Sequence, residues 1–234
     1  MATALTWLGH SAFRLDTPAG TRVYVDPFLS GNPACPAAEA EPERCDLVAL
    51  THGHDDHVGD TLAIAQRLGC PVAGLVEVCG WLTTKGLPQE QAIAFNKGGT
   101  VTVADVELTL TSANHSSSTF EDGRFLYLGE PAGLVLRPAD GPAVYFAGDT
   151  NVFGDMQLIG RIYAPDVAVL PIGDHFTMGP REAAVAIELL GTRRIVPCHY
   201  GTFPLLTGTP ERLRELAPAG TELLVPEPGE TLEL

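Results

Sequence analysis

Short apolar runs separated by turn residues open the chain and predict a β-meander. The strands of this meander are expected at residues 5–8, 12–16 and 22–26. Downstream of it, apolar runs alternate with segments in which apolar residues recur at helical spacing. Strands are expected at residues 46–50 and 71–75, and helices at residues 58–68 and 76–85. This alternation of strand and helix favours a half built on a mainly parallel sheet.

The second half begins with two strands at residues 100–103 and 106–111, where alternating polar and apolar residues predict an antiparallel pair. Residues 126–129 and 132–136 are expected to continue that sheet. Further strands are predicted at residues 143–147, 167–172 and 194–197, and helices at residues 155–163, 180–190 and 210–217. Since neither a linker nor a repeat interrupts this series, we expect one domain over residues 1–234.

The composition is that of a globular domain. Of the 234 residues, 45% are hydrophobic and 18% are charged. No apolar run is long enough for a membrane span, and residues 1–7 contain neither a basic region nor a long apolar segment. The five cysteines are an odd number without Cys-x-x-Cys spacing, which favours neither a disulfide framework nor a zinc ribbon. These observations predict a cytoplasmic protein without a membrane partner.

The charge of the chain limits the substrates that it is expected to bind. The 29 acidic residues against 14 Lys and Arg give a formal net charge of −15, and no basic run is present. Proteins that bind nucleic acids obtain most of their affinity from Lys and Arg side chains that neutralise phosphates. The composition therefore argues against a nucleic-acid partner and favours a small-molecule substrate.

Three of the seven histidines lie in one stretch, Thr51-His52-Gly53-His54-Asp55-Asp56-His57, which follows the predicted strand at residues 46–50. Gly53 and the absence of apolar residues predict that this stretch is a loop. Loops at strand ends are where open α/β sheets usually bind their ligands. Neutral imidazole is the commonest metal ligand in proteins, and carboxylate binds the same divalent ions. The stretch therefore predicts a metal site.

The pattern His52-x-His54-x-Asp56-His57 resembles the signature of the metallo-β-lactamase superfamily. Single residues farther along resemble the later motifs of that superfamily, and each lies directly after or close behind an apolar strand. These residues are His115, Asp149 and His199. The resemblance spans nearly the whole chain and implies an α/β fold, the four-layer αββα sandwich of the superfamily.

The resemblance also implies how two divalent metal ions are held. One ion would be bound by His52, His54 and His115 and the other by Asp56, His57 and His199, with Asp149 bridging both. Asp26, at the end of a predicted strand, matches an aspartate that hydrogen-bonds a metal-binding histidine from outside the ligand set. Two such ions share a hydroxide that acts as the nucleophile, so Asp56 and Asp149 are expected catalytic residues. Zinc is the ion expected first, and manganese or iron suits similar ligand sets.

Residues 7–11, 146–150 and 172–179 resemble a narrower branch, the small metal-dependent hydrolases similar to ascorbate-6-phosphate lactonases. His10 and His175 are then candidates for contacting the substrate or protonating the leaving group. In the superfamily, an aspartate at the bridging position is typical of hydrolases of thioesters, lactones and phosphodiesters, whereas common zinc β-lactamases carry cysteine there. The resemblance therefore implies hydrolysis of a small ester, lactone or phosphodiester. Related proteins commonly form homo-oligomers, so a homo-oligomer is expected for this protein as well.

Two other functions are compatible with the same motifs. The first is a mononuclear iron oxidoreductase similar to sulfur dioxygenases, which have this fold. The second is a metal-binding protein without catalytic activity. The full set of seven usual ligands and the lack of an added flavin domain favour hydrolysis over the first, which stays open. Because no ligand is missing, the second is the least favoured.

Overall fold

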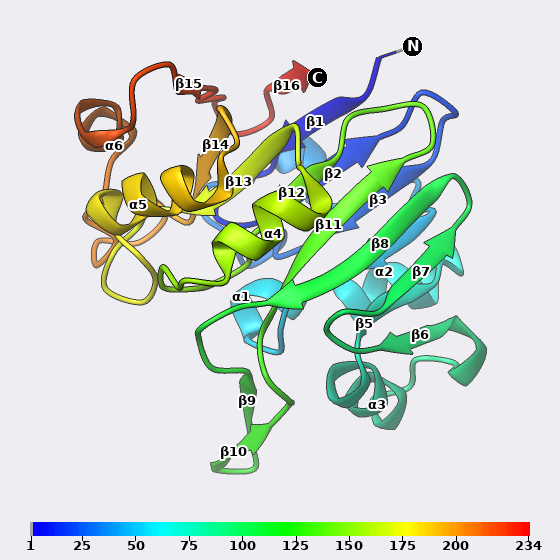
Figure 1. Ribbon diagram of the computed structural model, residues 1–234. Coiled ribbons are helices and arrows are strands. Elements are labelled where there is room, and N and C mark those ends of the chain that lie inside the picture. The colour runs from blue at the N-terminus through cyan, green and yellow to red at the C-terminus, as the bar shows by residue number, and fades with distance from the viewer. Residues whose placement is uncertain (1) are drawn as a thin grey trace.

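The computed structural model describes residues 2–234, which form two seven-stranded sheets packed face to face with helices on their outer sides (Figure 1). The four-layer αββα sandwich predicted from the sequence is therefore confirmed. A separate two-stranded hairpin extends from the body of the molecule.

The first sheet has the strand order β16-β1-β2-β3-β4-β5-β6. Its strands are β1 (Ala4–Trp7), β2 (Phe13–Asp16), β3 (Arg22–Val25), β4 (Leu47–Ala49), β5 (Val72–Leu75), β6 (Ala92–Phe95) and β16 (Thr231–Glu233). The predicted meander is antiparallel, and the pairs from β3 to β6 are parallel. Its helices are α1 (Asp55–Val58), α2 (Thr61–Leu68) and α3 (Val76–Thr84), with short 3₁₀ turns at Ala37–Glu39 and Gln89–Gln91.

The second sheet has the strand order β15-β14-β13-β12-β11-β8-β7. Its strands are β7 (Thr100–Val103), β8 (Val106–Ser112), β11 (Ala132–Pro138), β12 (Val144–Phe146), β13 (Val167–Pro171), β14 (Arg194–Cys198) and β15 (Glu222–Leu223). The helices of this half are α4 (Met156–Tyr163), α5 (Pro180–Leu190) and α6 (Pro210–Leu216).

Strand β13 shows how the layers are held together. Successive side chains of a strand point to opposite faces of its sheet, and all five residues of β13 are buried. Val167 and Val169 belong to the core shared with the first sheet. Ala168 and Leu170 belong to the core shared with the outer helices. The continuous apolar run of this strand is thus explained by burial of both of its faces.

The strands that precede the candidate site residues all end at the same edge of the sandwich. In the first sheet β3 and β4 are parallel. In the second sheet β12, β13 and β14 are parallel, and β8 runs in the same direction as β12 because both are antiparallel to β11. The loops after β3, β4, β8, β12 and β14 therefore meet at the carboxyl ends of the strands, where open α/β sheets bind ligands.

The helix predicted over residues 58–68 is in fact two helices, α1 and α2, separated at Gly59. A side chain at Gly59 would lie 2.5 Å from the Cα atom of Phe28, and the backbone φ there is +40°, so glycine alone suits this position. The prediction of a loop over residues 51–57 was wrong at its end, because Asp55 to His57 begin α1. The helical spacing of apolar residues continues from Val58 into α2, so the sequence pattern does not show that the helix is interrupted at Gly59.

The expectation that residues 126–129 continue the main sheet was also wrong. Residues 126 and 127 end β10 (Arg124–Tyr127), and residues 128–129 follow it outside any strand. Within residues 2–234, β10 pairs with β9 (Ser118–Glu121) alone, in the projecting hairpin (Figure 1). The sequence reasoning missed β9 together with the short strands β6, β15 and β16. Strands of two to four residues carry too few alternating positions to be recognised from periodicity.

None of the helices within residues 2–234 combines the length and the apolar character needed to cross a bilayer.

Two helical glycines give a stability prediction. A Cβ atom at Gly160 in α4 would lie 2.0 Å from the carbonyl oxygen of Leu190, whereas a Cβ at Gly80 in α3 would meet nothing within 4 Å. We expect Gly160→Ala to lower the free energy of unfolding by about 1–3 kcal/mol, because the helix must shift from α5. Gly80→Ala, the matched control, should raise it by about 0.5–1 kcal/mol through its higher helix propensity. Urea denaturation measures both, and equal effects would contradict the close packing at Gly160.

Candidate metal centre

The buried carboxylate of Asp26 organises the start of the site. It accepts hydrogen bonds from the backbone N–H and the hydroxyl of Thr51, at 2.9 and 2.6 Å. Its Oδ2 atom also lies 2.8 Å from Nδ1 of His57. Asp26 thus fixes the loop after β4 at its first residue and orients the ring of His57, so that the other ring nitrogen faces the centre.

A first group of possible ligands consists of His52, His54, His115 and Asp149, each of which offers one ligand atom within 4.8 Å of the others. His52 is fully buried, and its Nε2 atom lies 2.9 Å from Nδ1 of His54. Nε2 of His115 lies 3.6 Å from Oδ2 of Asp149. Residues from the first sheet and from the second sheet therefore meet in one cluster.

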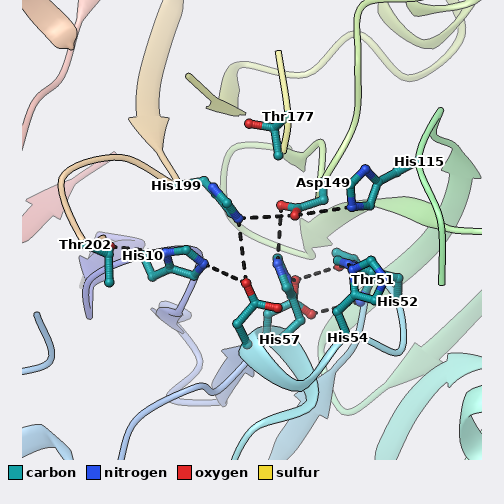
Figure 2. A network of polar contacts seen from close by, with 12 residues as sticks. His10, Thr51, His52, His54, His57, His115, Asp149, Thr177, His199 and Thr202 are labelled. Atoms are coloured by element: carbon teal, nitrogen blue, oxygen red, sulfur yellow. Dashed lines mark hydrogen bonds and ion pairs between the residues drawn. The ribbon is translucent and has the colours of Figure 1, made fainter. Parts of the chain in front are cut away.

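A second group consists of His10, Asp56, His57 and His199, again within 4.8 Å of one another. Nε2 of His199 lies 3.2 Å from Oδ2 of Asp149 and 3.8 Å from Oδ2 of Asp56. Nε2 of His57 lies 3.2 Å from Oδ1 of Asp149. Figure 2 shows Asp149 between His57, His115 and His199, so its carboxylate contacts members of both groups.

Burial and charge act against each other at this centre. Burial disfavours the charged form of Asp149, but the adjacent His199 and His57 hold the pKa of this carboxyl well below its usual range. Burial also disfavours the charged form of His57, yet Asp149 and Asp26 raise the pKa of this imidazole well above its usual range. The charge of the two carboxylates is therefore balanced by a protonated His57.

The histidines of the first group have pKa values shifted in the opposite direction. Burial lowers the pKa of His52, His54 and His115, and the neighbouring imidazole of His57 adds to the effect. A neutral imidazole has a free lone pair for a metal ion. These three side chains thus have the protonation state that ligands require.

Unpaired polar atoms show that the residues fit a metal ion. Within residues 2–234, several buried side-chain atoms of the centre have no hydrogen-bond partner: His57 Nε2, Asp149 Oδ1, His199 Nδ1 and His199 Nε2. A buried polar atom left unpaired costs about 1–3 kcal/mol. Divalent cations accept imidazole nitrogen and carboxylate oxygen as ligands, so an ion at this place would satisfy both Nε2 atoms and the carboxylate.

The seven residues predicted as ligands all lie in these two groups. Asp26 lies in hydrogen-bond contact with His57. His175 does not join them. Its side chain is exposed, and its ring packs against Phe176 at a centroid distance of 4.4 Å. The backbone of His175 has a φ of +54°, in a turn that follows β13 at the rim of the site.

Supporting hydroxyl groups were missed by sequence reasoning. Besides Thr51, the hydroxyl of Ser117 accepts from the backbone N–H of Gly53 and donates to the carbonyl oxygen of Leu128. Thr150 accepts from the backbone N–H of Asn114 in the same way. Serine and threonine are common in loops, so their sequence positions carry no signal for this role.

A cavity of about 720 Å³ opens beside the centre. His115 is shared between the cavity and the first ligand group. The cavity is formed by the loops after β8, β12 and β13 and by the starts of α5 and α6. Its charged lining residues are Asp174, Arg181, Glu182 and Arg212. A small polar molecule placed there would reach the metal ligands.

Comparisons with known proteins identify the family of this chain. The model of the beta-lactamase superfamily domain matches residues 21–200. A relative from Herpetosiphon aurantiacus, named a UPF0173 metal-dependent hydrolase, is 49% identical over 232 residues, covering 97% of this chain and 96% of the relative. A relative of the same name from Chloroflexus aurantiacus is 47% identical over 234 residues, with the same two coverages.

A solved structure is similar over nearly its full length. Igni18, described as a novel metallo hydrolase from the hyperthermophilic archaeon Ignicoccus hospitalis, shares 38% of its residues with this chain. The match covers 99% of this chain and 98% of that one, with a TM-score of 0.84.

The protonation of His57 predicts how metal affinity depends on pH. An ion binds His57 only after the imidazole loses its proton, whereas His52, His54 and His115 have lowered pKa values and are already neutral. We expect the affinity of the metal-free protein for Zn²⁺ to rise with pH, by up to about tenfold per unit, from about pH 6.5, the usual pKa of histidine, up to the raised pKa of His57. Competition with a chromophoric chelator measures it.

The control for this prediction is Asp26→Asn. It removes one of the two carboxylates that raise the pKa of His57, so less proton is displaced and the dependence on pH should be shallower. Equal slopes in the two proteins would show that His57 does not carry the displaced proton.

Proposed function

Because this chain belongs to the metallo-β-lactamase superfamily and is one of its metal-dependent hydrolases, we propose that it cleaves a small ester, lactone or phosphodiester with a pair of divalent ions. The observation that carries the proposal is the position of the Asp149 carboxylate. One of its oxygens lies 3.2 Å from His57 and the other lies 3.2 Å from His199 and 3.6 Å from His115. A carboxylate shared in this way is suited to bridge two ions.

The proposed ligand sets follow the two groups. His52, His54 and His115 would hold one ion, and Asp56, His57 and His199 would hold the other. Asp149 is grouped with the first set and also lies 3.2 Å from His57 and from His199, so it would serve both ions. Histidine and aspartate suit zinc, which we propose as the first ion to test, and they also bind manganese and iron. When bound, two such ions lower the pKa of a shared water and polarise an oxygen of the substrate.

The two aspartates of the centre have different surroundings. The side chain of Asp149 is 3% exposed, whereas that of Asp56 is 35% exposed. Burial opposes ionisation of Asp56, but the hydrogen bond from His10 and the charge of His57 keep its pKa below the usual range. Asp56 is therefore an ionised acceptor on the open side of the centre, suited to orient an attacking water.

The cavity beside His115 is the proposed substrate site. Its volume of about 720 Å³ suits a small molecule. Its lining contains charges of both signs, which favours a polar substrate. The net charge of −15 argues against nucleic acids as substrates.

Further expectations from the sequence remain part of the proposal. We propose that residues 1–234 act as one hydrolase domain, that the protein works in the cytoplasm, and that it forms homo-oligomers. The free state of all five cysteines supports a reducing compartment.

Metal content and hydrolysis test the proposal together. Protein purified without chelator should contain about two ions per chain and should hydrolyse bis(p-nitrophenyl) phosphate. Asp149→Ala should remove the shared ligand and lower turnover by at least about 10³-fold. Asp140→Ala, which changes an exposed carboxylate outside the centre, should retain both ions and full turnover.

Two results of these measurements would contradict the proposal. A single iron ion per chain with no hydrolysis of esters, lactones or phosphodiesters would contradict the proposal and favour an oxygen-dependent iron enzyme. Full turnover by Asp149→Ala would exclude the bridging role.

A further inference from the structure

His10 is a buried histidine of the centre that lies outside the seven predicted ligands. It follows Gly9 between β1 and β2, its side chain is completely buried, and its φ is +54°. Figure 2 shows its ring between Thr202 and the carboxylate next to His57. Complete burial removes His10 from direct contact with a substrate in the cavity.

Both nitrogens of the His10 ring have oxygen partners. Nε2 lies 3.0 Å from Oδ2 of Asp56, and Nδ1 lies 3.1 Å from the hydroxyl oxygen of Thr202. A neutral imidazole donates from one nitrogen and accepts at the other. Since an ionised carboxylate only accepts, the Nε2–H of His10 donates to Asp56, and Nδ1 accepts from the hydroxyl of Thr202.

The backbone of His10 is held from two sides. Its carbonyl oxygen accepts from the backbone N–H of His199 at 2.9 Å and from the indole N–H of Trp7 at 3.0 Å. The rings of His10 and His199 lie with their centroids 4.0 Å apart. Phe28 and Phe203 cover other edges of the His10 ring. The donor that faces Asp56 is therefore fixed relative to His199.

Asp56 needs such a support more than the other proposed ligands do. It lies in the first turn of α1, and its side chain is 35% exposed, so water competes for it. Within residues 2–234, the carboxylate of Asp56 makes one hydrogen bond, and its partner is His10. A carboxylate oxygen has two lone pairs, so Oδ2 accepts from His10 while it also faces Nε2 of His199 at 3.8 Å.

From these contacts we propose that His10 is a positioning residue, which donates a hydrogen bond to Asp56 and so holds this carboxylate toward the ion shared with His57 and His199. This inference rests on the two-ion function proposed above. His10 acts for Asp56 as Asp26 acts for His57, and partners of this kind typically change metal affinity by about 10–100-fold when they are removed.

Two other roles for His10 are a proton donor to the leaving group and a direct metal ligand. A proton donor to the leaving group must reach the substrate, and the buried ring does not. As a direct ligand through Nε2, His10 would give up its contact with Asp56, whereas the Nε2 atoms of His57 and His199 have no hydrogen bond to lose. The positioning role is the one that uses every observed contact.

The test compares His10→Gln with His10→Asn. The amide nitrogen of glutamine takes the place of Nε2 and can still donate to Asp56, whereas that of asparagine takes the place of Nδ1 and cannot reach it. Both variants are polar, so they match each other in their effect on folding. Stepwise Zn²⁺ titration of the metal-free proteins against a chromophoric chelator gives two dissociation constants for each protein.

We expect His10→Gln to bind both ions within about threefold of the wild type. His10→Asn should bind the second ion about 10–100-fold more weakly, and the first ion, held through His52, His54 and His115, should be unaffected. Added Zn²⁺ should then restore turnover of His10→Asn.

Other outcomes separate the possible failures. Equal loss of the second ion in both variants would identify His10 as a ligand and overturn the positioning role. Full binding of both ions by both variants, with reduced turnover, would identify a proton donor and also overturn it. Fewer than two ions on the wild type would instead overturn the two-ion function.

Discussion

A carboxylate buried as deeply as that of Asp149 is stable only when charges or hydrogen-bond donors surround it. In this protein those groups come from both sheets, because His57 follows β4 in the first sheet and His199 follows β14 in the second. Both imidazoles lie 3.2 Å from Asp149. The charge balance at one residue therefore requires the carboxyl ends of the two sheets to meet, and the sandwich gives them one common edge.

Backbone strain is concentrated at the same edge. His10, Asp26 and His199 all have a positive φ, of +54°, +46° and +54°. Such conformations cost residues other than glycine about 1–3 kcal/mol each and persist only where the surroundings hold them. The hydrogen bonds from His199 to His10 and from Thr51 to Asp26 supply that restraint. Part of the stability of the fold thus maintains the orientation of the site.

The sequence predicted the layers, most of the longer elements and the residues that the structure groups around Asp149. The prediction of the layers is confirmed where a local pattern carries the information, as in the continuous apolar run of β13. The metal ligands remain a prediction, which the grouping of His52, His54 and His57 supports. Predictions from the sequence fail where a distant contact decides the structure. Gly59 breaks a helix because its position lies against the backbone of Phe28, and His10 meets Asp56 only after the chain has folded. The role expected for His175 stays a prediction; its side chain is exposed, in a turn whose neighbours Asp174 and Phe176 line the cavity.

The contact between His10 and Thr202 joins residues 192 positions apart in the sequence, and β16 near the carboxyl terminus pairs with β1. During synthesis the N-terminal part of the chain emerges first. A ribosome-bound chain therefore exposes the imidazoles of His52, His54 and His57 long before His199 exists. The full set of side chains around Asp149 can therefore come together only after most of the polypeptide has been made, because His199 lies near the carboxyl end of the chain.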